Sequence, residues 1–270
     1  MITGIDLAAI DLAAGPCLMV FSHPNHELAI LGIVQRLRPH LVFLTDGGGE
    51  RRMAETRVGL AAAEGKERAR FLAHPENDFY RGLLAGDTEF FEGVARQVRE
   101  AIFETGARHV LCDAVEFYNP VHDLALPIAR AALRGRPGTR LFEVPLIHQA
   151  PAPGTERYVI QRFPKGRESA VLRYRLSPAE LAVKTRARER VYRLLGEQMG
   201  SLLGELPPAR LAEEIVAPAA PAQGEPDGDV VLRYEWRGRA LRDRGLVERV
   251  ITYRDHYRPL AAALTAGAAG

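Results

Sequence analysis

Short apolar runs alternate with longer helix-like segments over the first 150 residues of the chain. Each run has only four or five residues and lies next to turn-forming residues, which favours buried strands over helices. The expected strands cover residues 17–21, 40–44, 109–112 and 141–145. The expected helices cover residues 27–37, 55–73, 88–105 (with Thr88 as its cap) and 124–133, and a turn is expected at residues 74–78. This alternation predicts an α/β fold with a mostly parallel sheet and helices on both faces, in three layers.

The chain after residue 150 has weaker patterns. Short extended pieces are expected at residues 158–160 and 170–174. The helix after them begins at Ser177, a capping residue followed by Pro178 and Glu180, and is expected to continue to about residue 203.

Residues 205–229 are rich in proline, alanine and glycine, which is typical of a loop or linker. Beyond them, residues 230–236 have a strand-like pattern and residues 239–250 a helix-like one. We therefore expect a main α/β domain at 1–204, a linker loop at 205–229 and a small C-terminal extension at 230–270 that packs on the main domain.

The composition indicates neither a nucleic-acid nor a membrane partner. The 36 Lys and Arg nearly balance the 34 Asp and Glu, so the formal net charge is only +2. No apolar run approaches the roughly 18 residues of a membrane helix, and no secretory signal is evident. Cys17 and Cys112 lie in apolar runs without metal-binding spacing, so we expect buried free thiols and a cytoplasmic protein.

Polar side chains follow three of the expected strands. His23, Asn25, His26 and Glu27 follow the first strand, and Asp46 follows the second. The third strand is followed by further candidates for metal binding or proton transfer, namely Asp113, Glu116, His122 and Asp123. Because the carboxyl ends of parallel strands meet at one edge of a sheet, we expect these side chains to lie close together.

Three of these residues form a candidate metal site. Neutral imidazole is a common ligand of zinc and related divalent metals, and His23, His26 and His122 would supply three ligands with one position left open. Spacing alone leaves ordinary hydrogen-bonded histidines open as an alternative. That is how we interpret the other five histidines, His40, His74, His109, His148 and His256.

The segment Ser22-His23-Pro24-Asn25-His26-Glu27 resembles the His-Pro-Asp-Asp-Glu motif of the PIG-L/LmbE-like N-deacetylases. Residues 44–47 resemble the second strand end of that family, residues 119–122 its His-Pro-Asp-His motif, and residues 182–184 its lysine-bearing helix. The resemblance covers residues 16–200 and implies a Rossmann-like fold. It also implies a zinc-dependent hydrolase whose small-molecule substrate contains an acylated amino sugar or is a related polar metabolite.

The motif departs from the family at two positions. In the family the first His, the second Asp and the distal His bind zinc, and the first Asp is the general base. Carried over by position, His23 and His122 remain ligands, and His26 replaces a carboxylate ligand. Asn25 stands at the position of the base, although an amide cannot accept a proton near neutral pH; losing such a base typically slows a reaction by a factor of about 10² to 10⁴.

Five carboxylates could replace that base, namely Glu27, Asp46, Asp113, Glu116 and Asp123, and the first two are our first choices. Glu27 and Asp46 belong to the matching motifs, although capping of a helix or orientation of a ligand histidine is an equal alternative for Glu27. Arginine side chains and His148 are candidates for stabilising an oxyanion.

Three classes of function stay open at this point. The first is hydrolysis of an N-acyl group by a Zn²⁺ enzyme, the second is different metal chemistry, for example with Fe²⁺, and the third is non-catalytic binding of a sugar or nucleotide. Substrate contacts are expected from residues 46–56, 74–88, 113–121 and 148–168, with Arg51, Arg52 and Tyr118 as candidates. Residues 253–264 are suited either to a homo-oligomer interface or to packing within the chain.

Overall fold

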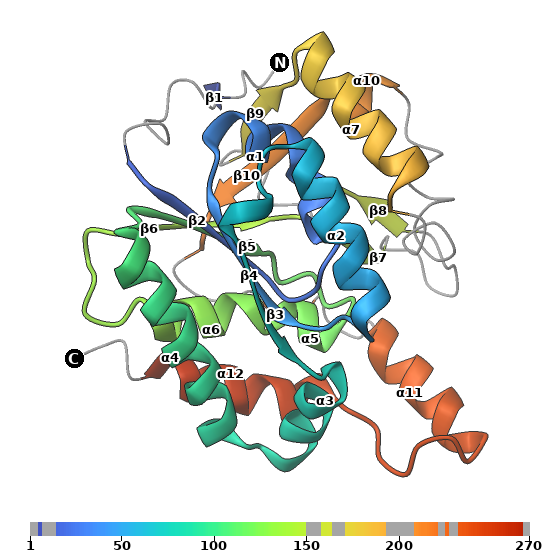
Figure 1. Cartoon of the computed structure of the whole chain (residues 1–270). Helices are drawn as coiled ribbons and strands as arrows, with labels where there is room; N and C mark the ends of the chain where they lie inside the picture. Colours follow the sequence, from blue (N-terminus) through green and yellow to red (C-terminus); the bar gives the residue numbers. More distant parts are fainter. Residues whose placement is uncertain are drawn as a thin grey trace.

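An eight-stranded sheet and a separate two-stranded ribbon form the framework of the computed structural model (Figure 1). The structure describes residues 5–6, 15–149, 158–163, 171–192, 208–220, 225–226 and 232–266. The sheet strands, in chain order, are β1 (Ile5–Asp6), β2 (Cys17–Phe21), β3 (His40–Thr45), β4 (Ala69–His74), β5 (His109–Asp113), β6 (Arg140–Val144), β9 (Leu172–Arg175) and β10 (Glu213–Pro218). The ribbon pairs β7 (Ile147–Gln149) with β8 (Tyr158–Ile160).

The strand order explains where a binding site can form. The order is β1-β9-β10-β6-β5-β2-β3-β4, and the strands from β6 to β4 are all parallel. β10 runs antiparallel to both of its neighbours. From β2 the chain adds β3 and β4 on one side and then returns to add β5 and β6 on the other. The carboxyl ends of β2 and β5 therefore lie side by side at a topological switch point, where α/β proteins form binding crevices.

Helices cover both faces of the sheet, as the sequence predicts (Figure 1). α1 (Leu31–Leu37), α2 (Glu50–Ala62) and α7 (Pro178–Arg190) lie on one face, and α4 (Thr88–Thr105), α6 (Ala125–Ala132) and α12 (Arg258–Ala266) lie on the other. In β2, Leu18 and Val20 pack into the core with α4 and α6, whereas Met19 and Phe21 pack into the core with α1. The strand is a continuous apolar run because both of its faces are buried.

The remaining helical elements connect these layers. They are the 3₁₀ helices His26–Ile30 and Lys66–Arg68, α3 (Glu76–Ala85), α5 (Pro120–Asp123), α10 (Pro208–Leu211), α11 (Arg233–Asp243) and the π-helical turn Tyr253–Tyr257. The helix expected at 27–37 is thus a 3₁₀ turn followed by α1. No helix among the described residues is long and apolar enough to span a membrane.

The helix expected at residues 55–73 is correct only as far as Ala62, and the expectations for residues 63–78 were wrong. Instead of one helix to residue 73, α2 ends at Ala62 and residues 69–74 form the edge strand β4. Residues 74–78, which were expected to form a turn, contain the start of helix α3. β4 lies at the edge of the sheet and is only partly buried, so it lacks the apolar run that marks the central strands.

The expectations for residues 205–250 also need correction. Residues 213–218 are not a loop but form β10, which pairs with β6 and β9 inside the sheet. Residues 233–243 form one helix, α11, rather than a strand followed by a helix. Residues 7–14, 150–157 and 193–207 lie outside the described residues, and with them the end of the helix that is expected to start at Ser177. The division into domains stays a prediction.

Two helix starts were predicted with different success. Ser177 and Glu180 form the expected capping box at the start of α7. At the start of α4, the cap is Asp87 rather than Thr88, because the Asp87 carboxylate accepts a hydrogen bond of 3.0 Å from the backbone N–H of Phe90.

Candidate metal centre

Three histidines from two loops meet at the switch point between β2 and β5. His23 and His26 follow β2, whereas His122 lies in α5, after β5. One nitrogen of each ring can be chosen so that all three lie within 4.8 Å of one another. The ring centroids are separated by 4.4 to 5.1 Å, with the rings edge to face. All three residues are buried.

Local backbone chemistry places these histidines. Asn25 has a left-handed backbone with a φ of 80°, which asparagine tolerates better than most residues, and the 3₁₀ helix starts at His26 directly after it. In the second loop, the side chain of Asn119 accepts a hydrogen bond from the backbone N–H of Val121, and Pro120 occupies the first turn of α5. His122 is therefore held two residues inside a short capped helix.

A buried carboxylate from β5 orients His26. Oδ2 of Asp113 lies 2.9 Å from Nδ1 of His26 and accepts hydrogen bonds from the backbone N–H (2.7 Å) and the hydroxyl (2.6 Å) of Ser22. Burial raises the pKa of Asp113 to about 7, although the Ser22 hydrogen bonds oppose the rise. A proton on Nδ1 of His26 leaves Nε2 as the metal-binding atom, which is the arrangement of a carboxylate–histidine–metal triad.

A second carboxylate, Glu76, lies beside His23 and was not among the residues singled out in the sequence. Its Oε1 lies 3.1 Å from Nε2 of His23 and accepts a hydrogen bond of 2.9 Å from the Tyr80 hydroxyl. Burial alone would raise the pKa of Glu76, but the His23 and Tyr80 contacts and the Arg52 charge together lower it to about 2. Glu76 is therefore ionised at neutral pH. It escaped sequence analysis because it opens α3, a helix that we expected to be a turn.

The cluster fits a divalent metal. Nδ1 of His23 and Nδ1 of His122 are buried, and neither has a hydrogen-bond partner among the described residues. Burial lowers the pKa of His26 and of His122 well below the ordinary value, and His23 and Arg52 lower both pKa values further. Both rings are therefore neutral at physiological pH, the form in which imidazole binds a metal. A bound cation would also satisfy the buried nitrogens that the protein leaves unpaired.

The three residues expected to be catalytic have structural contacts. Asn25 accepts a hydrogen bond from the Thr56 hydroxyl (2.8 Å) and lines the cavity beside the histidines. The Glu27 carboxylate accepts a hydrogen bond of 2.7 Å from the Tyr192 hydroxyl, and burial raises the pKa of Glu27 to about 7. Asp46 accepts hydrogen bonds from the backbone N–H groups of Gly48 and of residue 76, so it fixes the start of α3. Neither Glu27 nor Asp46 lines the cavity.

The remaining polar candidates are Glu116, Asp123 and His148. Glu116 accepts hydrogen bonds from the backbone N–H groups of Leu146 and Ile147, and Asp123 accepts them from the backbone N–H groups of residues 116 and 117. Both carboxylates therefore hold loops beside the histidines. His148 lies in β7 and does not line the cavity.

A cavity of about 1160 Å³ opens onto the histidines. Its walls include all three rings, Glu76 and the Gly47–Gly49 loop, together with Arg51, Arg52 and Tyr118, the three residues expected to contact substrate. A further wall comes from α11 and residues 247–251, which belong to the C-terminal segment. That segment was expected to pack on the main domain, and it also lines the candidate site.

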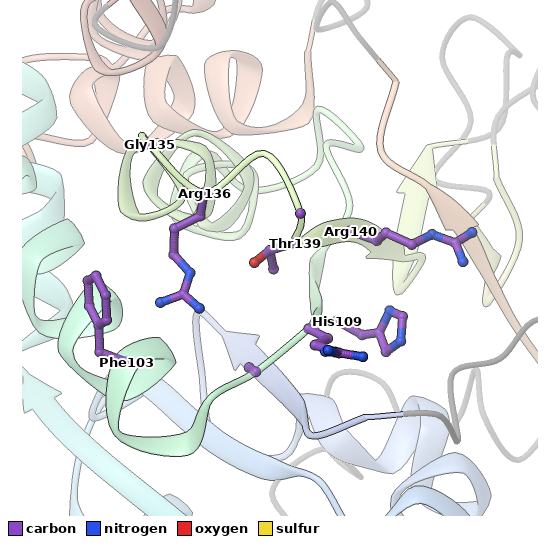
Figure 2. Close-up of a pocket in the computed structure, with 9 residues that line it drawn as sticks. Phe103, His109, Gly135, Arg136, Thr139 and Arg140 are labelled. Atoms are coloured by element: carbon purple, nitrogen blue, oxygen red, sulfur yellow. The ribbon is translucent and has the colours of Figure 1, made fainter.

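A second pocket lies at the opposite edge of the sheet, at the amino ends of β5 and β6 (Figure 2). Its volume is about 750 Å³, and its lining includes Arg136, Thr139, Arg140 and His109, which Figure 2 labels. Because a single histidine and no carboxylate line this pocket, we place the candidate metal centre at the histidine cluster instead.

Comparisons with known proteins relate this architecture to deacetylases. No family model matches the sequence, and no curated protein matches it. Among solved structures, a triple mutant of a deacetylase of the teicoplanin biosynthetic pathway matches with a TM-score of 0.52 and 15% identity, over 75% of this chain and 97% of that one. A pseudoaglycone deacetylase, Dbv21, matches with a TM-score of 0.51 and 14% identity, over 76% of this chain and 96% of that one. The chain therefore has the α/β fold of these deacetylases, with a buried three-histidine cluster capable of binding a metal where β2 and β5 end.

Proposed function

We propose that this protein is a metal-dependent hydrolase that removes an acyl group from the nitrogen of an amino sugar or a related polar metabolite. The observation that carries the proposal is the buried cluster of three histidines, which opens into a large cavity at the switch point of the sheet. The fold that the chain shares with two deacetylases supports the same reaction class.

His23, His26 and His122 would hold the metal. A bound divalent cation such as Zn²⁺ supplies an activated water and polarises the carbonyl of the scissile amide. Asp113 and Glu76 keep two of the three rings in fixed orientations, which raises the basicity of the ligands and limits their motion.

Glu76 replaces the missing aspartate as the group that takes up a proton. Asn25 cannot perform this role, and its amide is engaged by Thr56. Glu76 lines the cavity, contacts His23 and is held by the Tyr80 hydroxyl, so its ionised carboxylate is placed to accept a proton beside the histidines. Glu27 and Asp46 meet fewer of these conditions, because neither lines the cavity.

Arg52 stabilises negative charge that develops on the reacting carbonyl. Its guanidinium lines the cavity and donates a hydrogen bond of 3.3 Å to the backbone carbonyl of Gly47. Its positive charge contributes to the lowered pKa of both His26 and His122, so it acts at close range on the cluster. A fixed cation at this position would favour an oxyanion over the neutral amide.

The test measures amine release from a panel of N-acetylated amino sugars by the Zn²⁺-loaded protein. We expect turnover by the wild type and a loss of about 100-fold or more in the His122→Ala and Glu76→Gln variants, within the usual range for an acid–base group. His40→Ala is the matched control, since His40 begins β3 at the opposite edge of the sheet. A metal-loaded protein that releases no amine would contradict the proposal, and iron in the purified protein together with O₂ consumption would favour the iron enzyme instead.

A further inference from the structure

We propose that the substrate carries a carboxylate or phosphate group, and that Arg233 binds this group while the acylated nitrogen lies at the histidines. The inference rests on the proposed function of the same cavity and specifies its substrate class. It comes from α11, in the C-terminal segment that the resemblance to deacetylases does not cover.

Two tyrosines hold the Arg233 guanidinium in a fixed plane. Its central carbon lies 4.2 Å above the ring centroid of Tyr118 and 5.8 Å from that of Tyr158. Nε of Arg233 donates a hydrogen bond of 3.3 Å to the Tyr158 hydroxyl, and the two tyrosine rings meet edge to face at 5.5 Å. A guanidinium stacked in this way keeps its remaining N–H groups directed and loses little entropy when it binds a planar or tetrahedral anion.

The arginines of α11 divide into two sets by their partners. Arg239 and Arg242 do not line the cavity, and each forms an ion pair with a carboxylate of the same helix, Glu235 and Asp243 respectively. Arg233 and Arg237 line the cavity, and among the described residues no ion pair of either guanidinium is found. The helix therefore neutralises its solvent-facing cations and leaves its cavity-lining cations for a ligand, and Arg233 is the one of these two that the tyrosines hold in place.

The cavity wall as a whole carries more positive than negative side chains. Five arginines line it, namely Arg51, Arg52, Arg233, Arg237 and Arg249, against three glutamates, Glu50, Glu76 and Glu248. Two of the glutamates have partners, since Glu50 pairs with Arg57 and Glu76 contacts His23. A metal at the histidines would add further positive charge, so the site favours an anionic ligand over a neutral one.

The position of Arg233 sets where the anion lies relative to the reacting group. The Tyr118 ring contacts both the guanidinium and the cluster, with its centroid 4.2 Å from the central carbon of Arg233 and 6.1 Å from the ring centroid of His122. The Arg233 charge also contributes to the lowered pKa of His122. The anionic group is thus one ring away from the cluster, a separation that a substrate built on a single sugar ring can span.

The experiment compares two anionic sugars with a neutral one by isothermal titration calorimetry on the full-length protein. The ligands are N-acetylglucosamine 6-phosphate, N-acetylmuramic acid and neutral N-acetylglucosamine. We expect at least one anionic sugar to bind the wild type about 10- to 100-fold more tightly than the neutral one, the range for hydrogen bonds to charged groups. Arg233→Met should abolish this preference, Arg233→Lys should retain part of it, and Arg242→Met, on the same helix, should leave it unchanged.

The outcomes separate this inference from the proposed function. Equal affinity for neutral and anionic sugars, no binding of either anionic sugar, or a preference that survives in a folded Arg233→Met variant would overturn the inference. Circular dichroism verifies that each variant is folded. Release of amine from neutral sugars without an anion preference would support the hydrolase proposal and refute the anion site at Arg233. An Arg233-dependent preference without any amine release would support the anion site and refute the hydrolase proposal.

Discussion

Asp113→Asn should weaken metal binding without unfolding the protein. Oδ2 of Asp113 accepts three hydrogen bonds, two from Ser22 and one from His26. An asparagine oxygen in the same place can keep the Ser22 bonds, but the bond to the imidazole loses its charge assistance. Charged hydrogen bonds contribute about 1.5–3 kcal/mol and neutral ones about 0.5–1.5 kcal/mol, so the orientation of His26 weakens by roughly 1–1.5 kcal/mol.

The measured quantity is the dissociation constant for Zn²⁺, obtained by competition with a chromophoric chelator at fixed pH and ionic strength. Loss of an orienting carboxylate typically lowers metal affinity by about 10- to 100-fold. We expect Asp113→Asn at the lower end, about 10-fold, because a factor of ten corresponds to about 1.4 kcal/mol. Asp123→Asn is the control, because it removes another buried carboxylate that accepts backbone N–H groups instead of an imidazole. Unchanged Zn²⁺ affinity in Asp113→Asn, or an equal loss in both variants, would refute the role given to Asp113.

Three further predictions concern stability. Lys184→Met should destabilise the fold by about 3–5 kcal/mol in urea unfolding. Nζ of Lys184 lies 2.8 Å from Oε1 of buried Glu214, so the substitution leaves the Glu214 carboxylate buried without its cationic partner. Gly59→Ala should cost about 1–3 kcal/mol by the same assay, since a Cβ there would lie 2.0 Å from the Tyr192 hydroxyl. Asn25→Asp should lower the melting temperature measured by circular dichroism, because the side-chain amide of Asn25 donates a hydrogen bond to the Glu55 carboxylate, which would repel an aspartate. An unchanged melting temperature would contradict this prediction.

The central strands and the histidine cluster were predictable because their signals are local. β2 and β5 are buried on both faces, and burial on both faces requires an apolar run that is visible in the sequence itself. The parallel order then brings His23, His26 and His122 to the same edge of the sheet. The expectation that the strands run parallel was therefore enough to predict that these three histidines lie close together.

The elements that were missed depend on partners far away in the chain. β10 contains a buried glutamate, Glu214, which makes the strand look like a solvated loop until Lys184 of α7 is placed beside it. Glu76 reaches the site only because β4 forms at the sheet edge and Asp46 fixes the start of α3. Arg233 reaches the cavity through a helix whose residues alternate like a strand. None of these contacts has a period or spacing that a single sequence reveals.

Metal content is the most direct test of the account. The protein is purified without added metal, loaded with Zn²⁺ and dialysed, and its bound metal is measured by inductively coupled plasma mass spectrometry alongside the His23→Ala, His26→Ala and His122→Ala variants. The account predicts one tightly bound metal per chain in the wild type and loss of that metal in each variant, with the folded state verified by circular dichroism. A wild type that retains no metal, or histidine variants that retain it fully, would contradict the assignment of this cluster as a metal centre.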